Sequence, residues 1–161
     1  MMNFKKNDKV KFKICTTRKR DSFHLSWDGL LTIDEPITAQ ALETQLMVEF
    51  LSDICNIDSP TDYKEGVDKV GRCFIEFAEE KGWKVEVCSK KVSGDVICIT
   101  LNPNAEKAPI SISGHMDTVH PIGSFGTPAV RREGNRLYGP GTKDCKGGIV
   151  AGLLAMDALS Q

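Results

Sequence analysis

Residues 109–119 read PISISGHMDTV, and the first half of this stretch decides the fold class. Its β-rich composition and its length are typical of a strand. The runs WKVEVCS at 83–89 and GDVICITL at 94–101 have the same character, and Gly94 separates them. The sequence therefore predicts three strands in close succession.

Apolar residues at spacings of three and four predict helices on both sides of these strands. The predicted helices cover about residues 38–54, 63–81 and 146–161, and Gly82 would end the second one in a left-handed conformation. Helices that flank strands in this way predict a layered α/β domain. The final helix has neither a cap nor a following strand, so the chain is expected to stop in mid-architecture.

Composition limits the number of domains and the kinds of partner. With 161 residues, of which 40% are hydrophobic, the chain suffices for one domain. A net charge of -1 gives no reason to expect a nucleic-acid or membrane partner, so a small-molecule or peptide substrate is expected. The six cysteines form no C-x-x-C pair and are typical of reduced thiols in a cytoplasmic protein. No apolar stretch approaches the roughly 20 residues of a membrane span, and no signal peptide is recognisable.

Residues 1–36 form an N-terminal segment of uncertain structure, ahead of the domain expected over residues 37–161. Lys9–Ile14 alternate like a short strand. Residues 1–21 carry eight Lys or Arg against two Asp. A clamp for an acidic partner is one interpretation of this charge, and a solvated terminus is the favoured one.

Two candidate site residues follow the last predicted strand. His115 and Asp117 lie at its carboxyl end, which is where open α/β sheets bind ligands. At this spacing both side chains leave an ideal strand on the same face, so the carboxylate could orient a metal-binding imidazole or a neighbouring catalytic acid. An H-x-D pair by itself is more often an ordinary loop histidine beside an aspartate.

A third candidate, Asp144, lies in GPGTKDCKGG at 139–148, just before the final helix. Taken alone, it is interpreted as a helix cap. A phosphate-binding nest is an alternative, although this segment does not match the G-x-x-x-x-G-K-[ST] motif.

Together, HMDTV at 115–119 and YGPGTKDCKGG at 138–148 resemble the signature of a zinc metallopeptidase family. That family includes glutamate carboxypeptidase, aminotripeptidase, acetylornithine deacetylase and succinyl-diaminopimelate desuccinylase. The two motifs are most similar to those of the glutamate carboxypeptidase branch. The strong match covers about residues 109–159. The resemblance implies a three-layer αβα domain of the zinc-exopeptidase type.

By position, the resemblance makes His115 a ligand of one zinc ion, Asp117 the carboxylate that orients the catalytic centre, and Asp144 the carboxylate that bridges two zinc ions. Co or Mn could substitute for Zn. A metal-activated water would attack the amide or peptide bond of a small peptide or an N-acyl amino acid. The resemblance also implies a cis peptide bond between Asp144 and Cys145 and a homodimeric parent enzyme.

The resemblance is partial, because the family's general base and further ligands would lie beyond Gln161. These are an adjacent Glu pair, a further acidic residue and a late histidine. The chain is therefore expected to be the N-terminal half of a longer catalytic domain, inactive alone and prone to self-association. The parent would be a carboxypeptidase or dipeptidase, with an N-acyl-amino-acid deacylase or a non-catalytic binding module as alternatives.

Other polar residues are weaker candidates. A loop or substrate-contact role is favoured for His120 over ligation, and an idle thiol is favoured for Cys145 over a zinc ligand. His24 has no partner in the sequence and is assigned no function. Three basic residues could meet a substrate carboxylate, although surface solvation is the default expectation for them, namely Arg131, Arg132 and Lys146.

Overall fold

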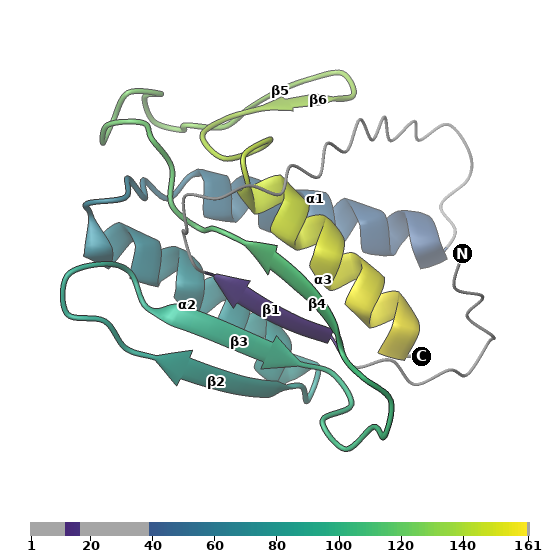
Figure 1. Cartoon of the computed structure of the whole chain (residues 1–161). Coiled ribbons are helices and arrows are strands. Elements are labelled where there is room, and N and C mark those ends of the chain that lie inside the picture. Colours follow the sequence, from purple (N-terminus) through teal and green to yellow (C-terminus); the bar gives the residue numbers. More distant parts are fainter. Residues whose placement is uncertain (1–11, 17–38, 161) are drawn as a thin grey trace.

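The computed structural model describes residues 12–16 and 39–160, with side chains described over residues 45–160 (Figure 1). Its strands are β1 (Phe12–Thr16), β2 (Lys84–Cys88), β3 (Val96–Thr100), β4 (Ile110–Gly114), β5 (Arg131–Glu133) and β6 (Arg136–Tyr138). Its helices are α1 (Ala39–Cys55), α2 (Lys64–Glu80) and α3 (Lys146–Ser160). The predicted strands and helices are confirmed, whereas the short β5–β6 hairpin was not predicted.

Four strands form one mixed sheet in the order β2-β3-β1-β4. β3 is antiparallel to both of its neighbours, whereas β1 and β4 are parallel. In this register Ile14 of β1 pairs with Ile99 of β3 and with Ile112 of β4. The carboxyl end of β4 therefore lies at the same end of the sheet as the β2–β3 hairpin.

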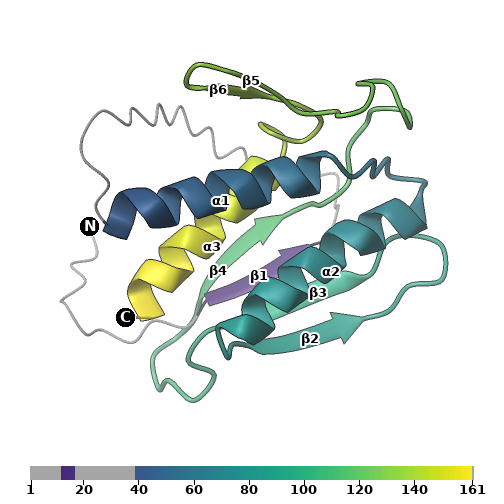
Figure 2. The same cartoon turned by 180° about the vertical axis from the view of Figure 1, so that it is seen from behind.

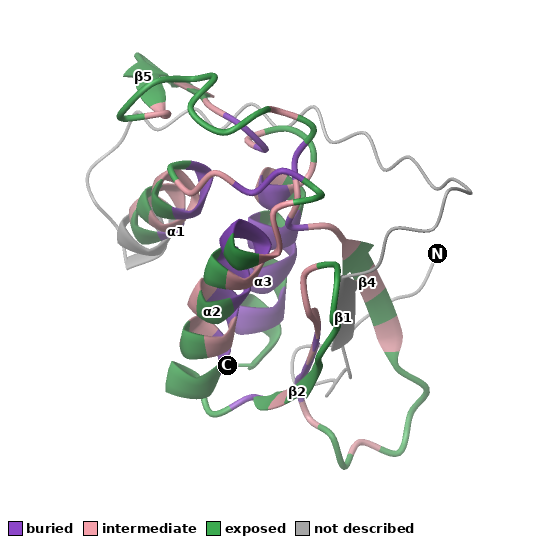
Figure 3. Ribbon diagram, turned by 90° about the vertical axis from the view of Figure 1, so that its left-hand side faces the viewer, coloured by how far each residue is buried: buried purple, intermediate pink, exposed green. Residues whose placement is uncertain are grey.

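All three described helices lie on one face of this sheet (Figure 2, Figure 3). α2 packs against β2 and β3, α3 packs against β4, and α1 packs on α3. The predicted α/β class is confirmed. Over residues 12–16 and 39–160 the arrangement has two layers, and the third layer that the family resemblance implies remains a prediction.

The core lies between the helices and the sheet. Fully buried apolar side chains from the helices and from β3 line it, namely Ile54, Val70, Ile99, Leu153 and Met156. α1 and α2 also meet through the rings of Phe50 and Phe74, whose centroids lie 5.7 Å apart. Burial of each large apolar side chain stabilises the fold by about 1.5–3 kcal/mol, so this core fixes how the helices lie on the sheet.

α2 ends where the sequence predicts. Gly82 has φ 69°, and the Trp83 amide donates a 2.9 Å hydrogen bond to the carbonyl of Ala78. This pairing caps the last carbonyls of the helix, and it needs a residue that tolerates positive φ. The left-handed stop at Gly82 is thus confirmed.

Part of the uncertain N-terminal segment belongs to the sheet, because β1 lies within residues 1–36. Most of the basic arm, and His24, lie outside the described residues, so the alternatives for that arm remain predictions. Among the described helices, none has the length and apolar character needed to cross a membrane.

Candidate metal centre

The predicted site residues meet where β4 ends and α3 begins. β4 ends at Gly114, and His115 and Asp117 follow it directly. Asp144 precedes the first turn of α3. Gly114 permits this approach, because a Cβ at that position would lie 2.6 Å from Cγ1 of Ile149. Strand end and helix start can therefore bring His115 and Asp144 into contact.

His115 lies between two carboxylates. Its Nδ1 is 3.0 Å from Oδ1 of Asp117 and 2.9 Å from the backbone oxygen of the same residue. Its Nε2 is 3.0 Å from Oδ1 of Asp144. The two contacts with Asp117 fix the plane of the ring and favour a proton on Nδ1, so Nε2 is directed at Asp144.

The two carboxylates differ in exposure and in their effect on the imidazole. The side chain of Asp117 is 13% exposed, whereas that of Asp144 is 86% exposed. The hydrogen bond that the ring donates to Asp117 is the largest cause that raises the pKa of His115 to about 9. Burial opposes this rise, and Asp144 adds a smaller one. Hydrogen bonds from both ring nitrogens to carboxylates favour the protonated form of His115.

The loop between the first two helices supports this site. The α1–α2 loop, residues 56–63, lies against the segment that carries Asp117. The Thr61 hydroxyl donates to the second carboxylate oxygen of Asp117, and the Thr61 amide donates to the carbonyl of Thr118 at 3.2 Å. Thr118 in turn donates its amide to the carbonyl of Ser59 at 2.8 Å. In the sequence, only the turn residues of NIDSPTD mark this loop. They do not indicate which residues the loop contacts.

The turn before α3 holds Asp144 through close backbone contacts. The peptide bond between Asp144 and Cys145 is cis, as the family resemblance implies. Gly141 has φ 83°, a left-handed conformation that favours glycine. A Cβ at Gly147 would lie 2.1 Å from the carbonyl oxygen of Thr142, so only glycine fits there. Glycine thus permits both the tight turn and the close backbone approach in this segment.

The expectation of a solvated Lys146 is wrong. Its side chain is fully buried, and its Nζ donates hydrogen bonds to the carbonyls of Ile54 at 2.8 Å and Ile57 at 3.0 Å. Burial is the largest cause that lowers the pKa of Lys146 to about 8. Carbonyls at the end of α1 attract this ammonium, because a helix leaves its last carbonyls without partners within the helix.

His120 and Arg131 are loop and surface residues. His120 makes an edge contact with Phe125, with ring centroids 4.8 Å apart. Arg131 is exposed, lies over the ring of Tyr138 at 4.9 Å and pairs with Glu133. The expected solvation of Arg131 is confirmed, and the role of His120 remains a prediction.

The expected solvation of Arg132 is confirmed, whereas the idle thiol at Cys145 remains a prediction. Arg132 is exposed, and its Nε donates a 3.5 Å hydrogen bond to the carbonyl of Gly134 within the β5–β6 hairpin. Cys145 is partly buried beside Gly114, and burial raises the pKa of its thiol. A thiol held protonated in this way is a poor metal ligand or nucleophile.

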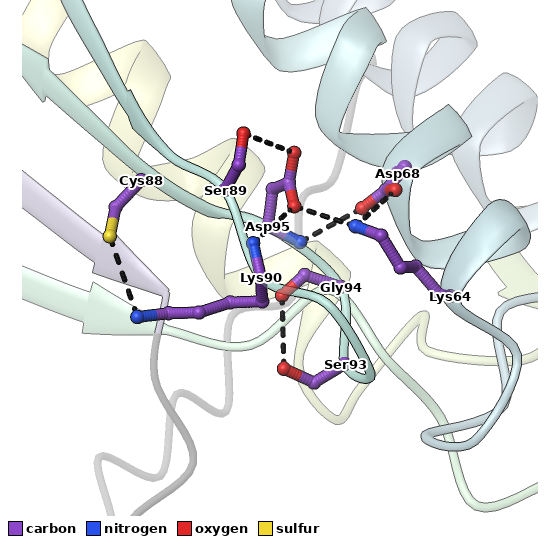
Figure 4. Close-up of polar contacts among 8 residues, drawn as sticks. All are labelled: Lys64, Asp68, Cys88, Ser89, Lys90, Ser93, Gly94 and Asp95. Atoms are coloured by element: carbon purple, nitrogen blue, oxygen red, sulfur yellow. Dashed lines mark hydrogen bonds and ion pairs between the residues drawn. The ribbon is translucent and has the colours of Figure 1, made fainter.

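The β2–β3 hairpin, residues 89–95, forms a second polar cluster near the site (Figure 4). The carboxylate of Asp95 accepts hydrogen bonds from Lys64 Nζ at 2.6 Å and from the Lys90 amide at 2.8 Å. The Asp95 amide donates to Oδ1 of Asp68 at 2.8 Å, so the hairpin is held on the first turns of α2. A shallow hollow lies between this hairpin and the α1–α2 loop.

The donor set at the site fits zinc in part. An imidazole nitrogen and a carboxylate oxygen are common zinc ligands, and Nε2 of His115 and the exposed Asp144 carboxylate lie side by side. Along the described part of the chain, no three or more His, Cys, Asp or Glu side chains gather as a metal-binding group. The structure thus brings the three predicted residues together, and their roles as ligands and catalytic carboxylate remain predictions.

Comparisons with known proteins match the part of the chain that carries the three candidate residues. Residues 111–161 match the model of peptidase family M20/M25/M40, and this segment contains His115, Asp117 and Asp144. The chain is 34% identical over 110 residues to Carboxypeptidase G2 of Pseudomonas sp. (strain RS-16), a match that covers 66% of this chain and 26% of that relative. The chain thus spans about a quarter of the length of that relative. The resemblance noted in the sequence is confirmed, because residues 111–161 match the model of a peptidase family.

Proposed function

We propose that this chain supplies His115, Asp117 and Asp144 to a zinc-dependent hydrolase of amide or peptide bonds in small substrates. The observation that carries the proposal is the imidazole held between two carboxylates, within the segment that matches a peptidase family. In this proposal His115 and Asp144 bind metal, and Asp117 orients the imidazole.

The chain's own residues prepare the metal-binding atoms. Asp117 favours the proton on Nδ1 of His115, so loss of the other proton would leave the lone pair of Nε2 on the side of Asp144. Bound zinc would supply a Lewis acid that polarises the substrate carbonyl and lowers the pKa of a water molecule. Because zinc needs the unprotonated Nε2, binding must release the proton that the raised pKa of His115 holds there.

The proposed parent is a carboxypeptidase or dipeptidase that acts on small peptides. The name of the relative, a carboxypeptidase, favours this substrate class over the N-acyl-amino-acid deacylase alternative. We further propose two zinc ions, with Co or Mn as substitutes, a homodimeric parent and a cytoplasmic location. The proposed partners include neither nucleic acid nor a membrane.

This chain alone is proposed to be inactive. A zinc site needs about three or more protein ligands, and His115 and Asp144 provide two. In the described residues no other His, Cys, Asp or Glu joins them in a metal-binding group. The missing ligands would then come from a longer parent chain.

Calorimetric titration with zinc tests the proposal on this chain and on the parent. The parent should bind zinc tightly and this chain weakly, and Asp144→Ala should abolish binding in both. Glu133→Ala is the matched control, because that exposed carboxylate pairs with Arg131 away from the site. Tight binding that survives Asp144→Ala would contradict the assignment of Asp144.

A non-catalytic binding module that keeps only the scaffold is the second candidate. The same incomplete donor set favours it. The hydrolase proposal would give way to this module if the parent chain bound no zinc and its Asp117→Asn variant stayed folded and kept its ligand binding.

A further inference from the structure

Lys146 is the first residue of α3 and is fully buried. A buried ammonium is costly unless its hydrogen bonds are satisfied. Its partners are the carbonyls of Ile54 and Ile57, which lie at the end of α1 and at the start of the α1–α2 loop. The ammonium is therefore bound to backbone carbonyls, and its full burial excludes direct contact with a substrate.

The aliphatic part of Lys146 lies under the turn that carries Asp144. A Cβ at Gly141 would lie 2.8 Å from Cδ of Lys146, so turn and lysine are in close contact. The Gly147 amide, in the first turn of α3, donates a 3.2 Å hydrogen bond to the carbonyl of Gly141. This bond links the Asp144 turn to the start of α3. Lys146 thus joins the Asp144 turn to the α1–α2 loop.

The other side of the same loop holds the segment that carries Asp117. The buried hydroxyl of Ser59 donates to the carbonyl of Met116 at 3.0 Å, and the Thr118 amide donates to the carbonyl of Ser59 at 2.8 Å. Thr61 holds the Asp117 carboxylate itself. The two halves of the site therefore share one support, although they come from different parts of the chain.

We propose that Lys146 is a positioning residue, which ties the Asp144 turn to the α1–α2 loop and so sets the place of Asp144 relative to His115 and Asp117. The effect of Lys146 on metal binding rests on the proposed function. Its effect on the position of Asp144 does not depend on zinc. Lys146 acts through backbone carbonyls and makes no contact with the proposed metal.

The test uses the whole chain and Lys146→Met, which keeps the side-chain length and removes the ammonium. Amide hydrogen exchange of Thr118 is the first readout, because that amide bonds to the loop and lies far from Lys146 in sequence. We expect its exchange to become about tenfold faster, as a local opening. Met156→Ala, a buried change at the other end of α3, is the control for general loss of stability.

Zinc titration is the second readout. Lys146→Met should weaken zinc binding about tenfold, whereas Met156→Ala should leave it within about twofold. Unchanged Thr118 exchange in a folded Lys146→Met variant, or an equal effect of Met156→Ala, overturns the proposal. If the unsubstituted chain and the parent bind no zinc, the proposed function fails, and the exchange of Thr118 still decides the role of Lys146.

A second variant covers the case in which Lys146→Met does not fold. Ser59→Ala removes the hydroxyl bond to Met116 on the opposite side of the loop. If the loop couples the two halves, this change must also accelerate exchange of the Gly147 amide. An effect confined to residues 116–118 would contradict the proposed coupling.

Discussion

Replacement of Asp117 by Asn should lower the pKa of His115 sharply. The pKa of His115 is raised from 6.5 to about 9, and the hydrogen bond that the ring donates to Asp117 is the largest cause. Asn keeps the size of the side chain and one acceptor oxygen but removes the negative charge. At about 1.4 kcal/mol per pKa unit, the whole shift corresponds to about 3 kcal/mol in favour of the protonated ring. A loss of about one unit or more is therefore expected, since Asp117 is the less exposed carboxylate.

Asp144→Asn is the matched comparison. Its carboxylate is equally close to the imidazole, but the side chain is 86% exposed, so water screens its charge. We expect a fall in the pKa of His115 of less than about half a unit. The difference between the two variants measures exposure, because the distances are the same, 3.0 Å for each pair.

The assay is an NMR titration of the histidine ring signals in the presence of a chelator, with His115→Gln to assign the resonance. The reasoning would be refuted by a pKa of His115 that stays near 9 in Asp117→Asn. A larger fall in Asp144→Asn than in Asp117→Asn would refute it equally.

The same shift predicts how stability depends on pH. Because the pKa of His115 is higher in the folded chain, its contribution is fully present below pH 6.5 and is lost as the pH rises through about 9. The urea midpoint of the unsubstituted chain should fall across this window. Asp117→Asn should show a smaller fall, and an equal fall in both proteins would contradict the assignment to His115.

Three further predictions concern the fold. Phe74→Ala should destabilise the chain by about 3–5 kcal/mol in urea unfolding, because its ring is buried against α1; a loss below about 1 kcal/mol would show that the core is packed otherwise. Gly66→Ala should also destabilise, although helix propensity alone predicts a gain of about 1 kcal/mol, because the added Cβ would lie 2.1 Å from the carbonyl oxygen of Asp58; a more stable variant would contradict this contact. Cys55 should resist alkylation in the folded chain, since burial raises its pKa to about 11, while the exposed Cys88 should react, as mass spectrometry of the modified sites can measure.

The sequence predicted the elements that carry a strong local pattern. The apolar spacing located α1, α2 and α3, and the H-x-D and GPGTKDCKGG segments located the three candidate site residues. It did not predict the β5–β6 hairpin, whose strands are three residues each and too short for a clear alternation. The place of β1 in the sheet was also out of reach, because strand order depends on pairing between distant segments.

Lys146 illustrates a different limit. A lysine is rarely buried without partners, so solvation was the reasonable expectation. Its partners are two backbone carbonyls about 90 positions earlier in the chain, one of them Ile54. Backbone carbonyls are present at every residue, so no side-chain pattern in the sequence marks the ones that accept from Lys146. Only the packing of α1 on α3 identifies them.

The family match and the structure contribute different information about the site. The family model begins at residue 111, so it covers the candidate ligands but excludes the α1–α2 loop that supports them. Thr61 and Ser59 contact residues 116–118 through one hydroxyl each and through backbone groups. Such contacts depend on where the loop lies, and the loop lies there because α1 and α2 are fixed by the core. The placement of His115, Asp117 and Asp144 is therefore a property of the helical layer as much as of the strand and turn that carry them.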